Sequence, residues 1–308
     1  MIISKIIIGE RIDKFLGQYL AEYSRSAIQK KIADGFVTVN GNQVTKKYIL
    51  QEDDVLDIND NDLVIPEGFL VKPNDQVKVD VIEETEDYIV VNKPAGLITH
   101  PGDTHLVNDT LVNGLLARFP EIEQVGDDEM RPGIVHRIDK DVSGVMVIAR
   151  NSEMFNLLKQ QFKDRKVYKK YLALAHGVFT EKHGVITFDL ARSKRNRTKM
   201  AAMPPGQGKT AISEYEVIQQ FQHYALVSVL IHTGRTHQIR AHLNAIGHPL
   251  IGDDIYKPKN MASRLQPGRI FLHASDISFI DQNNVKKSYN VPLTKSLQVI
   301  IDDLYSTI

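Results

Sequence analysis

The chain has 308 residues, of which 42% are hydrophobic and 25% are charged, and its 38 lysines and arginines balance 38 aspartates and glutamates. This length allows two domains, one with a substantial core, and the composition is typical of a soluble globular protein. The absence of cysteine excludes disulfides, thiolate metal sites and a cysteine nucleophile, and it favours a reducing, cytoplasmic location. No apolar run approaches membrane-spanning length, and MIISKIIIGER at the N-terminus predicts a first strand rather than a signal peptide.

Residues 10–58 have the pattern of a compact unit. Apolar residues at helical spacing predict a helix over residues 11–23, and Ser24 is expected to cap a second helix over residues 25–33. Residues 36–40 alternate as a strand, Asn40-Gly41 predicts a tight hairpin turn, and residues 55–58 can supply another strand.

This order of elements, with Ser24-Arg25-Ser26 opening the second helix and VNG at the turn, resembles the S4 RNA-binding domain. In that family the second helix and the hairpin present basic side chains to RNA. A solvated helix face would explain some of these side chains equally well, and the order of elements favours RNA. The residues that match the RNA-binding role are Arg25, Lys30, Lys31, Lys46 and Lys47.

From Glu52 to Asp87 the composition is acidic, with scattered prolines and glycines, which predicts an interdomain linker. We place the boundary near residue 70, so that residues 1–70 hold the S4 domain and the start of the linker, and residues 71–308 form the larger domain. RNA would repel so acidic a linker.

The most informative stretch is RPGIVHRIDKDVSGVMVIARN, residues 131–151. Residues 145–149 are continuously apolar, which predicts a strand buried on both faces, and the six residues from His136 to Asp141 hold five ionisable side chains. A charged loop on a buried strand is a rigid support for polar groups, so this loop is the first candidate for an active site. Asp139 lies between two cations that favour its ionised form, although a charged surface turn is the alternative interpretation.

Further strands and helices surround this motif. Strands are predicted over residues 88–91 and 224–231 and through Tyr171, and helices over residues 111–119, 153–162 and 237–245, with another strand and a final helix within residues 271–304. The basic run RSKRNRTK is expected to contact an RNA backbone or to form a solvated loop, and its cations are Arg192, Lys194, Arg195, Arg197 and Lys199.

Two other patterns are rejected as sites. GQGKT lacks the glycine spacing of a phosphate-binding loop. His237 and His242 are five residues apart and would not share a helix face, so we expect no metal.

HRIDKDVSG followed by an apolar strand resembles the catalytic motif of the RluA-type pseudouridine synthases, and this resemblance implies that Asp139 is the essential aspartate. EDYIVVNKPAGLITHPG resembles the entry to the same family's domain, and KKYLALA places Tyr171 at its active-site tyrosine. TGRTHQIRAH resembles the third motif, which implies that Arg235 pairs with Asp139. In the resembling family the arginine two residues before the aspartate enters the gap left by a flipped base, and the resemblance implies this role for Arg137.

The resemblance implies an α+β fold: a pseudouridine synthase domain over residues 71–308, with a mixed, mainly antiparallel central sheet flanked by helices and a catalytic cleft, preceded by a small S4 domain. It implies no cofactor, because the isomerisation needs no redox change or external group. The order of motifs is most like the RluD-like members, which modify large-subunit ribosomal RNA. We therefore expect an RNA partner, no membrane or nucleotide cofactor, and a monomer.

Several alternatives remain open at this level. Relatives with the same motifs modify transfer RNA or other ribosomal sites, and an S4 protein could bind RNA without catalysis. A glycosidase usually needs two opposed carboxylates and a nuclease a metal cluster, and neither pattern is evident. Asp139 could attack C1′, add to the ring or remove a sugar proton, and Tyr171 could be a base or a ring-stacking wall.

Overall fold

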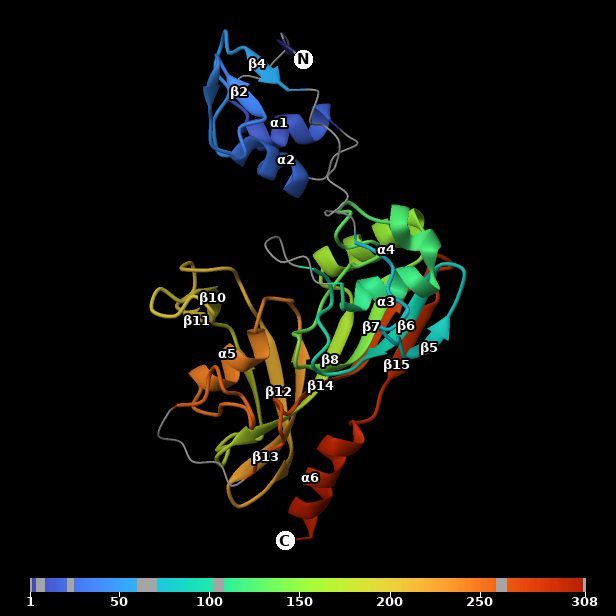
Figure 1. The fold of residues 1–308 in the computed structure, drawn as a ribbon. Coiled ribbons are helices and arrows are strands. Elements are labelled where there is room, and N and C mark those ends of the chain that lie inside the picture. Colours follow the sequence, from blue (N-terminus) through green and yellow to red (C-terminus); the bar gives the residue numbers. More distant parts are fainter. Residues whose placement is uncertain are drawn as a thin grey trace.

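The structure is a computed structural model that describes residues 2–3, 9–20, 25–59, 71–101, 108–258 and 265–306. Most of its helices and strands are labelled in Figure 1. No helix in this part of the chain has the length and apolarity needed to cross a membrane.

The N-terminal unit packs two helices on a small antiparallel sheet. Its helices are α1 (Ile12–Tyr19) and α2 (Arg25–Ala33), and its strands, in the order β1-β4-β2-β3, are β1 (Ile2–Ile3), β4 (Leu56–Ile58), β2 (Val37–Val39) and β3 (Asn42–Gln43).

The two helices and the hairpin agree with the sequence prediction. Asn40 and Gly41 have φ angles of 54° and 77°, the left-handed values that a two-residue hairpin turn needs. The last residues of the predicted first helix and the proposed cap Ser24 lie outside the described residues.

The larger unit is built on a nine-stranded sheet, whose strands run in the order β5-β6-β7-β14-β8-β13-β12-β9, with β15 beside β14. Among the described strands only β7 and β14 pair in parallel, so the prediction of a mixed, mainly antiparallel sheet is confirmed. The bounds are β5 (Val81–Glu84), β6 (Tyr88–Lys93), β7 (Ser143–Ala149), β8 (Tyr168–His176), β9 (His183–Ile186), β12 (Ser213–Gln220), β13 (Tyr224–Ile231), β14 (Leu272–Ile280) and β15 (Lys286–Asn290).

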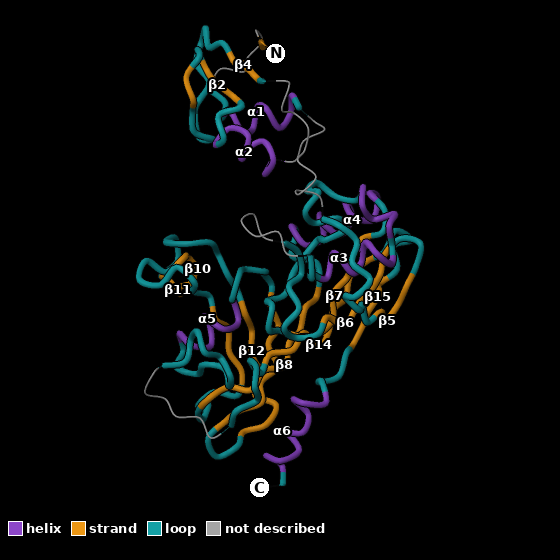
Figure 2. The backbone as a smooth tube through the Cα atoms, viewed as in Figure 1, coloured by secondary structure: helices purple, strands orange, loops and turns teal. Residues whose placement is uncertain are grey.

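Helices cover this sheet, and Figure 2 shows α3 and α4 near its β5–β7 end and α5 near β12. Asn151 caps α4 by accepting a hydrogen bond from the Met154 amide at 2.9 Å. The remaining bounds are α3 (Leu111–Arg118), a 3-10 helix η3 (Pro120–Gln124), α4 (Ser152–Lys163), α5 (Gln238–Ala245), α6 (Lys295–Tyr305), and the separate hairpin of β10 (Asp189–Arg192) and β11 (Met200–Met203).

The parallel contact between β7 and β14 brings distant parts of the sequence together. Ala274 on β14 is paired with Gly144 on one side and with Tyr171 of β8 on the other. Gly144 has a φ angle of +125°, and a Cβ there would lie 2.1 Å from the Ala274 carbonyl oxygen, so only glycine permits this approach. One strand, β14, therefore separates β8, which carries Tyr171, from β7, which follows the Asp139 loop.

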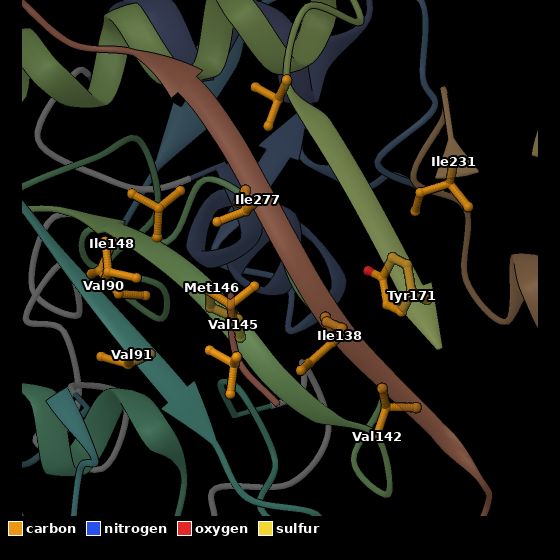
Figure 3. Packing of buried hydrophobic residues seen from close by; sticks show 14 of the residues in the cluster. Val90, Val91, Ile138, Val142, Val145, Met146, Ile148, Tyr171, Ile231 and Ile277 are labelled. Carbon is orange, nitrogen blue, oxygen red and sulfur yellow. The ribbon is translucent and has the colours of Figure 1, made fainter. Parts of the chain in front are cut away.

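The main core holds that loop in place. Figure 3 shows Ile138 and Val142, one on each side of Asp139 in the sequence, in the same buried cluster as Val145 and Tyr171. Both anchors are at most 5% exposed. Because apolar side chains on either side of Asp139 are buried in a close-packed interior, the carboxylate between them has a defined position.

Candidate active site

The loop that carries Asp139 is braced by the turn after β6. The ammonium of the fully buried Lys93 donates to the carbonyls of Pro94 (2.9 Å), Leu97 (2.6 Å) and Lys140 (3.0 Å). The Gly96 amide donates to the same Lys140 carbonyl at 2.9 Å. The NKPAG segment thereby fixes the residue that directly follows Asp139.

The four residues predicted for catalysis and base flipping line one pocket of about 90 Å³. Asp139 and Arg137 come from the loop before β7, Tyr171 from β8, and Arg235 from the turn between β13 and α5. The pocket thus joins segments that are nearly 100 residues apart.

Asp139 pairs with Arg240, not with Arg235. The Arg240 Nη1 atom donates to Asp139 Oδ2 at 3.2 Å, whereas the Arg235 Nε atom donates to the Thr210 carbonyl at 3.1 Å. The predicted Arg235–Asp139 pair is therefore wrong in this structure.

The turn before α5 explains the difference. The Gln238 side chain accepts from the Arg235 amide at 3.1 Å and so holds the backbone of this turn, while the Arg235 side chain donates to the Thr210 carbonyl. His237 then takes the left-handed conformation (φ 55°), and the first turn of α5 carries Arg240 to the pocket.

Asp253 orients the Arg240 guanidinium through two hydrogen bonds. The carboxylate of Asp253, which is 1% exposed, accepts from Arg240 Nε at 2.8 Å and from Nη2 at 2.9 Å. Burial alone would lower the pKa of Arg240, but the hydrogen bonds and charges of Asp253 and Asp139 raise it above its ordinary value. A two-pronged pair of this kind fixes the plane of the guanidinium, so its remaining nitrogen is aimed at Asp139.

A second contact reaches Asp139 through a histidine and a tyrosine. His237 Nε2 lies 3.9 Å from Asp139 Oδ2, and its Nδ1 lies 3.2 Å from the Tyr256 hydroxyl. That hydroxyl also accepts from the Met200 amide at 2.7 Å, so its hydrogen can be donated to Nδ1. Burial lowers the pKa of His237, which favours the neutral imidazole, and a hydrogen bond from Tyr256 to Nδ1 would leave Nε2 as the protonated nitrogen beside the carboxylate.

Sequence reasoning missed Arg240, Asp253 and Tyr256. A usable signal was present, because Arg240 belongs to the TGRTHQIRAH motif and the other two belong to the GDDIY string that closes the same segment. The buried, paired charge of Asp253 is visible only in three dimensions.

Tyr171 is 8% exposed, and its ring forms one wall of the pocket. Burial, and in second place the charge of Asp139, raise the pKa of its hydroxyl above the ordinary value. At neutral pH the residue is therefore a protonated phenol, which suits a stacking wall or a hydrogen-bond donor better than a base.

Arg137 lies exposed at the mouth of the pocket, where its Nη1 is 3.2 Å from His100 Nε2. The other nitrogen of His100 lies 2.8 Å from the Pro101 carbonyl, and burial lowers the pKa of His100 to about 4. The neutral ring therefore accepts the hydrogen bond from Arg137 and orients this exposed side chain.

The predicted RNA-contacting cations are not among the residues that line the pocket. Lys30, Lys46 and Lys47 are exposed, and Lys31 lies over the Phe36 ring at 5.1 Å. The side chain of Arg25 lies outside the described residues.

The second basic set occupies the loop of the β10–β11 hairpin. Lys199, at its base, lies over the Tyr256 ring at 5.6 Å, and the exposed members are Arg192, Lys194, Arg195 and Arg197. For both sets the RNA contacts stay a prediction.

Comparison with known proteins identifies the class. Residues 87–245 match the RNA pseudouridylate synthase family, and residues 10–56 match the S4 domain. The chain belongs to this family and is an RNA pseudouridine synthase, an isomerase, with an S4 domain in front of its synthase domain. The expected family, fold and enzyme class are confirmed.

Two relatives cover nearly the whole chain. The uncharacterized RNA pseudouridine synthase YlyB of Bacillus subtilis is 36% identical over 301 residues, which are 96% of this chain and 94% of YlyB. A ribosomal large subunit pseudouridine synthase D of Blochmanniella floridana is 34% identical over 311 residues, covering 95% of this chain and 94% of the relative.

A solved structure shares the fold. Human RNA Pseudouridylate Synthase Domain Containing 1 is 24% identical, with a TM-score of 0.57, over 76% of this chain and 98% of that chain.

Proposed function

We propose that this enzyme converts specific uridines of large-subunit ribosomal RNA to pseudouridine and that Asp139 is its catalytic carboxylate. The observation that carries the proposal is the pair between Asp139 and Arg240 at a pocket also lined by Tyr171 and Arg137. The substrate assignment is supported by relatives named ribosomal large subunit pseudouridine synthase D, which are 31% to 35% identical to this chain.

The reaction breaks the bond between ribose C1′ and uracil N1 and forms a bond between C1′ and C5. The C5 hydrogen leaves as a proton, N1 gains a proton, and no electrons or atoms are supplied from outside. Asp139 would supply the negative charge beside the ribose, and Arg240, backed by Asp253, would keep the carboxylate aimed.

The uridine must leave its helix to reach this pocket, which costs a few kcal/mol. Arg137, exposed at the mouth, would enter the gap, and Tyr171 would stack on the displaced base. Arg235, which lines the same pocket, would contact the RNA rather than hold the aspartate.

The wider organisation follows from the same proposal. Residues 1–70 would form the S4 domain and the start of the linker, and residues 71–308 the synthase domain. The S4 lysines and the basic hairpin would supply sequence-independent phosphate contacts. An enzyme acting on ribosomal RNA would work in the cytoplasm, and we propose that it does so as a monomer.

The test is pseudouridine mapping of large-subunit ribosomal RNA and of transfer RNA from cells that lack this protein. Wild-type protein should restore the missing pseudouridines in ribosomal RNA, and Asp139→Asn should restore none. Restoration by Asp139→Asn would overturn the catalytic assignment. If pseudouridines were missing only from transfer RNA, the assignment of ribosomal RNA as substrate would be wrong. If none were missing from either RNA, only the RNA-binding role would remain supported.

A further inference from the structure

A second cavity, of about 390 Å³, shares Arg137, Tyr171 and Arg235 with the pocket. Five cations line it, and no carboxylate is among its lining residues. We call it the cationic groove. Its cations are Arg131, Arg137, Lys163, Lys169 and Arg235.

Lys169 is the unusual member of this set, because it is only 8% exposed. Its ammonium lies over the Phe162 ring at 5.4 Å, and that ring stacks on His136 at 4.8 Å. Among the residues that the structure describes, no carboxylate or hydrogen-bond acceptor is paired with this ammonium. A buried ammonium without a counter-charge is costly, and the face of one aromatic ring offsets only part of that cost.

The strand that carries Lys169 shows that its direction is specific. Lys169 and Tyr171 are two residues apart on β8, so both face the groove, whereas Lys170 between them faces the opposite side. Lys170 is paired with Asp276 at 3.2 Å. Of two adjacent lysines, therefore, one has its counter-charge within the protein and the other has a cavity in front of it.

We propose that the cationic groove binds a backbone phosphate adjacent to the target uridine and that the Lys169 ammonium is the group that pairs with it. This inference rests on the proposed function, because a uridine whose ribose lies at Asp139 is covalently joined to a phosphate on each side. The groove and the pocket adjoin at Arg137, Tyr171 and Arg235, so an RNA backbone that enters the pocket would pass through the groove.

The charge state of Lys169 agrees with this role. Burial lowers the pKa of its amine to about 8, so the ammonium form still predominates at neutral pH. Burial removes water from around the ammonium, and a phosphate would compensate by supplying an opposite charge. Arg131, another cation that lines the groove, lies 3.6 Å from Asp128, so part of its charge is already balanced within the protein.

The test compares Lys169→Met with Lys170→Met in the full-length protein. Methionine keeps most of the side-chain volume and removes the charge in both variants, and Lys169→Arg tests whether a cation alone is sufficient. Two experiments are made. The first measures the affinity for a ten-nucleotide oligouridylate as a function of salt, and the second measures kcat and KM for release of tritium from unmodified large-subunit ribosomal RNA labelled at uridine C5.

Lys169→Met should weaken oligouridylate binding about five- to tenfold and reduce the slope of log affinity against log salt by about 0.7, the value for one phosphate contact on a single strand. The KM should rise by a similar factor, with kcat changed less than about threefold. Lys170→Met should leave both measurements at the wild-type level, and Lys169→Arg should restore most of the affinity.

An unchanged salt slope in Lys169→Met would overturn the phosphate assignment, and so would a fall in kcat at constant KM, which would indicate a role in proton transfer. Thermal unfolding of Lys169→Met at or above the wild-type temperature excludes misfolding as the cause. Because phosphate contacts are independent of sequence, the oligouridylate experiment decides this inference even if wild type fails to modify ribosomal RNA, a result that would count against the proposed substrate alone.

Discussion

The pocket and the β10–β11 hairpin both present cations, but they hold them differently. At the pocket, Arg240 is buried and fixed by two hydrogen bonds to Asp253. On the hairpin, Lys194, Arg195 and Arg197 project from a short loop into solvent. A buried charge whose partners are fixed can orient a reacting group, whereas exposed charges attract a polyanion without setting its geometry. We therefore expect substitutions in the first region to change turnover and those in the second to change binding.

Asp139→Asn should have the largest effect. The amide keeps the shape of the side chain and removes the negative charge, so kcat should fall about 10³-fold or more, while RNA affinity changes less than about threefold. Tritium release from labelled ribosomal RNA and filter binding measure the two quantities. Residual turnover above about a tenth of wild type would contradict the role given to this carboxylate.

Arg240→Met should reduce kcat about a hundredfold and lower the free energy of unfolding by about 3–5 kcal/mol, because Asp253 would be left as a buried charge without its partner.

Arg235→Met is the matched control, since this arginine lines the same pocket but donates only to a carbonyl there. It should cost less than about 1 kcal/mol of stability and less than about tenfold in kcat. If Arg235→Met reduced kcat and stability more than Arg240→Met, the result would support the Arg235–Asp139 pair expected from sequence.

The stability of Lys169→Met relative to wild type should depend on pH. The pKa of Lys169 is about 8 in the folded protein, against 10.5 for a lysine in an unfolded chain, so folding penalises the charged amine. Wild type carries this penalty in full below pH 8 and loses it as the pH rises towards 10.5. The variant should therefore be more stable than wild type by up to about 3 kcal/mol at about pH 7, and the two should converge near pH 10. Denaturant unfolding at several pH values measures this, and a constant difference would refute it.

Tyr256→Phe should lower kcat about tenfold with little change in KM, because it removes the hydroxyl that contacts His237 and accepts from the Met200 amide. A double-mutant cycle with His237→Ala provides the control. If the hydroxyl acts through the histidine, the two effects should be far from additive. Additive losses would mean that Tyr256 only supports the hairpin.

Removing the hairpin charges should have the smallest effect per residue. Alanine at Lys194, Arg195 or Arg197 should each weaken binding of ribosomal RNA about two- to threefold and reduce the salt slope by up to about 0.9, with kcat at saturating RNA unchanged. Alanine at Lys182, an exposed lysine before β9, should change neither quantity. A fall in kcat would show that the hairpin does more than attract RNA.

Local pattern determined much of this protein. Residues 145–149 read as a doubly buried strand because they are continuously apolar, and β7 is buried along its whole length. The helix over residues 153–162 and the hairpin turn at Asn40-Gly41 were predictable too, since helical spacing and turn φ angles depend on neighbouring residues alone. The motif around Asp139 likewise indicated the family from a few contiguous residues.

Tertiary structure alone decided which arginine pairs with Asp139. Arg235 and Arg240 occupy one motif, and their sequence spacing does not show that the Arg235 side chain donates to Thr210 while the buried Asp253 fixes Arg240. The difference between Lys169 and Lys170 also depends on residues far along the chain, because Asp276 arrives on a neighbouring strand. Sequence determines a residue's secondary structure through local forces, but its charge partner is determined by the segments that folding brings to its side.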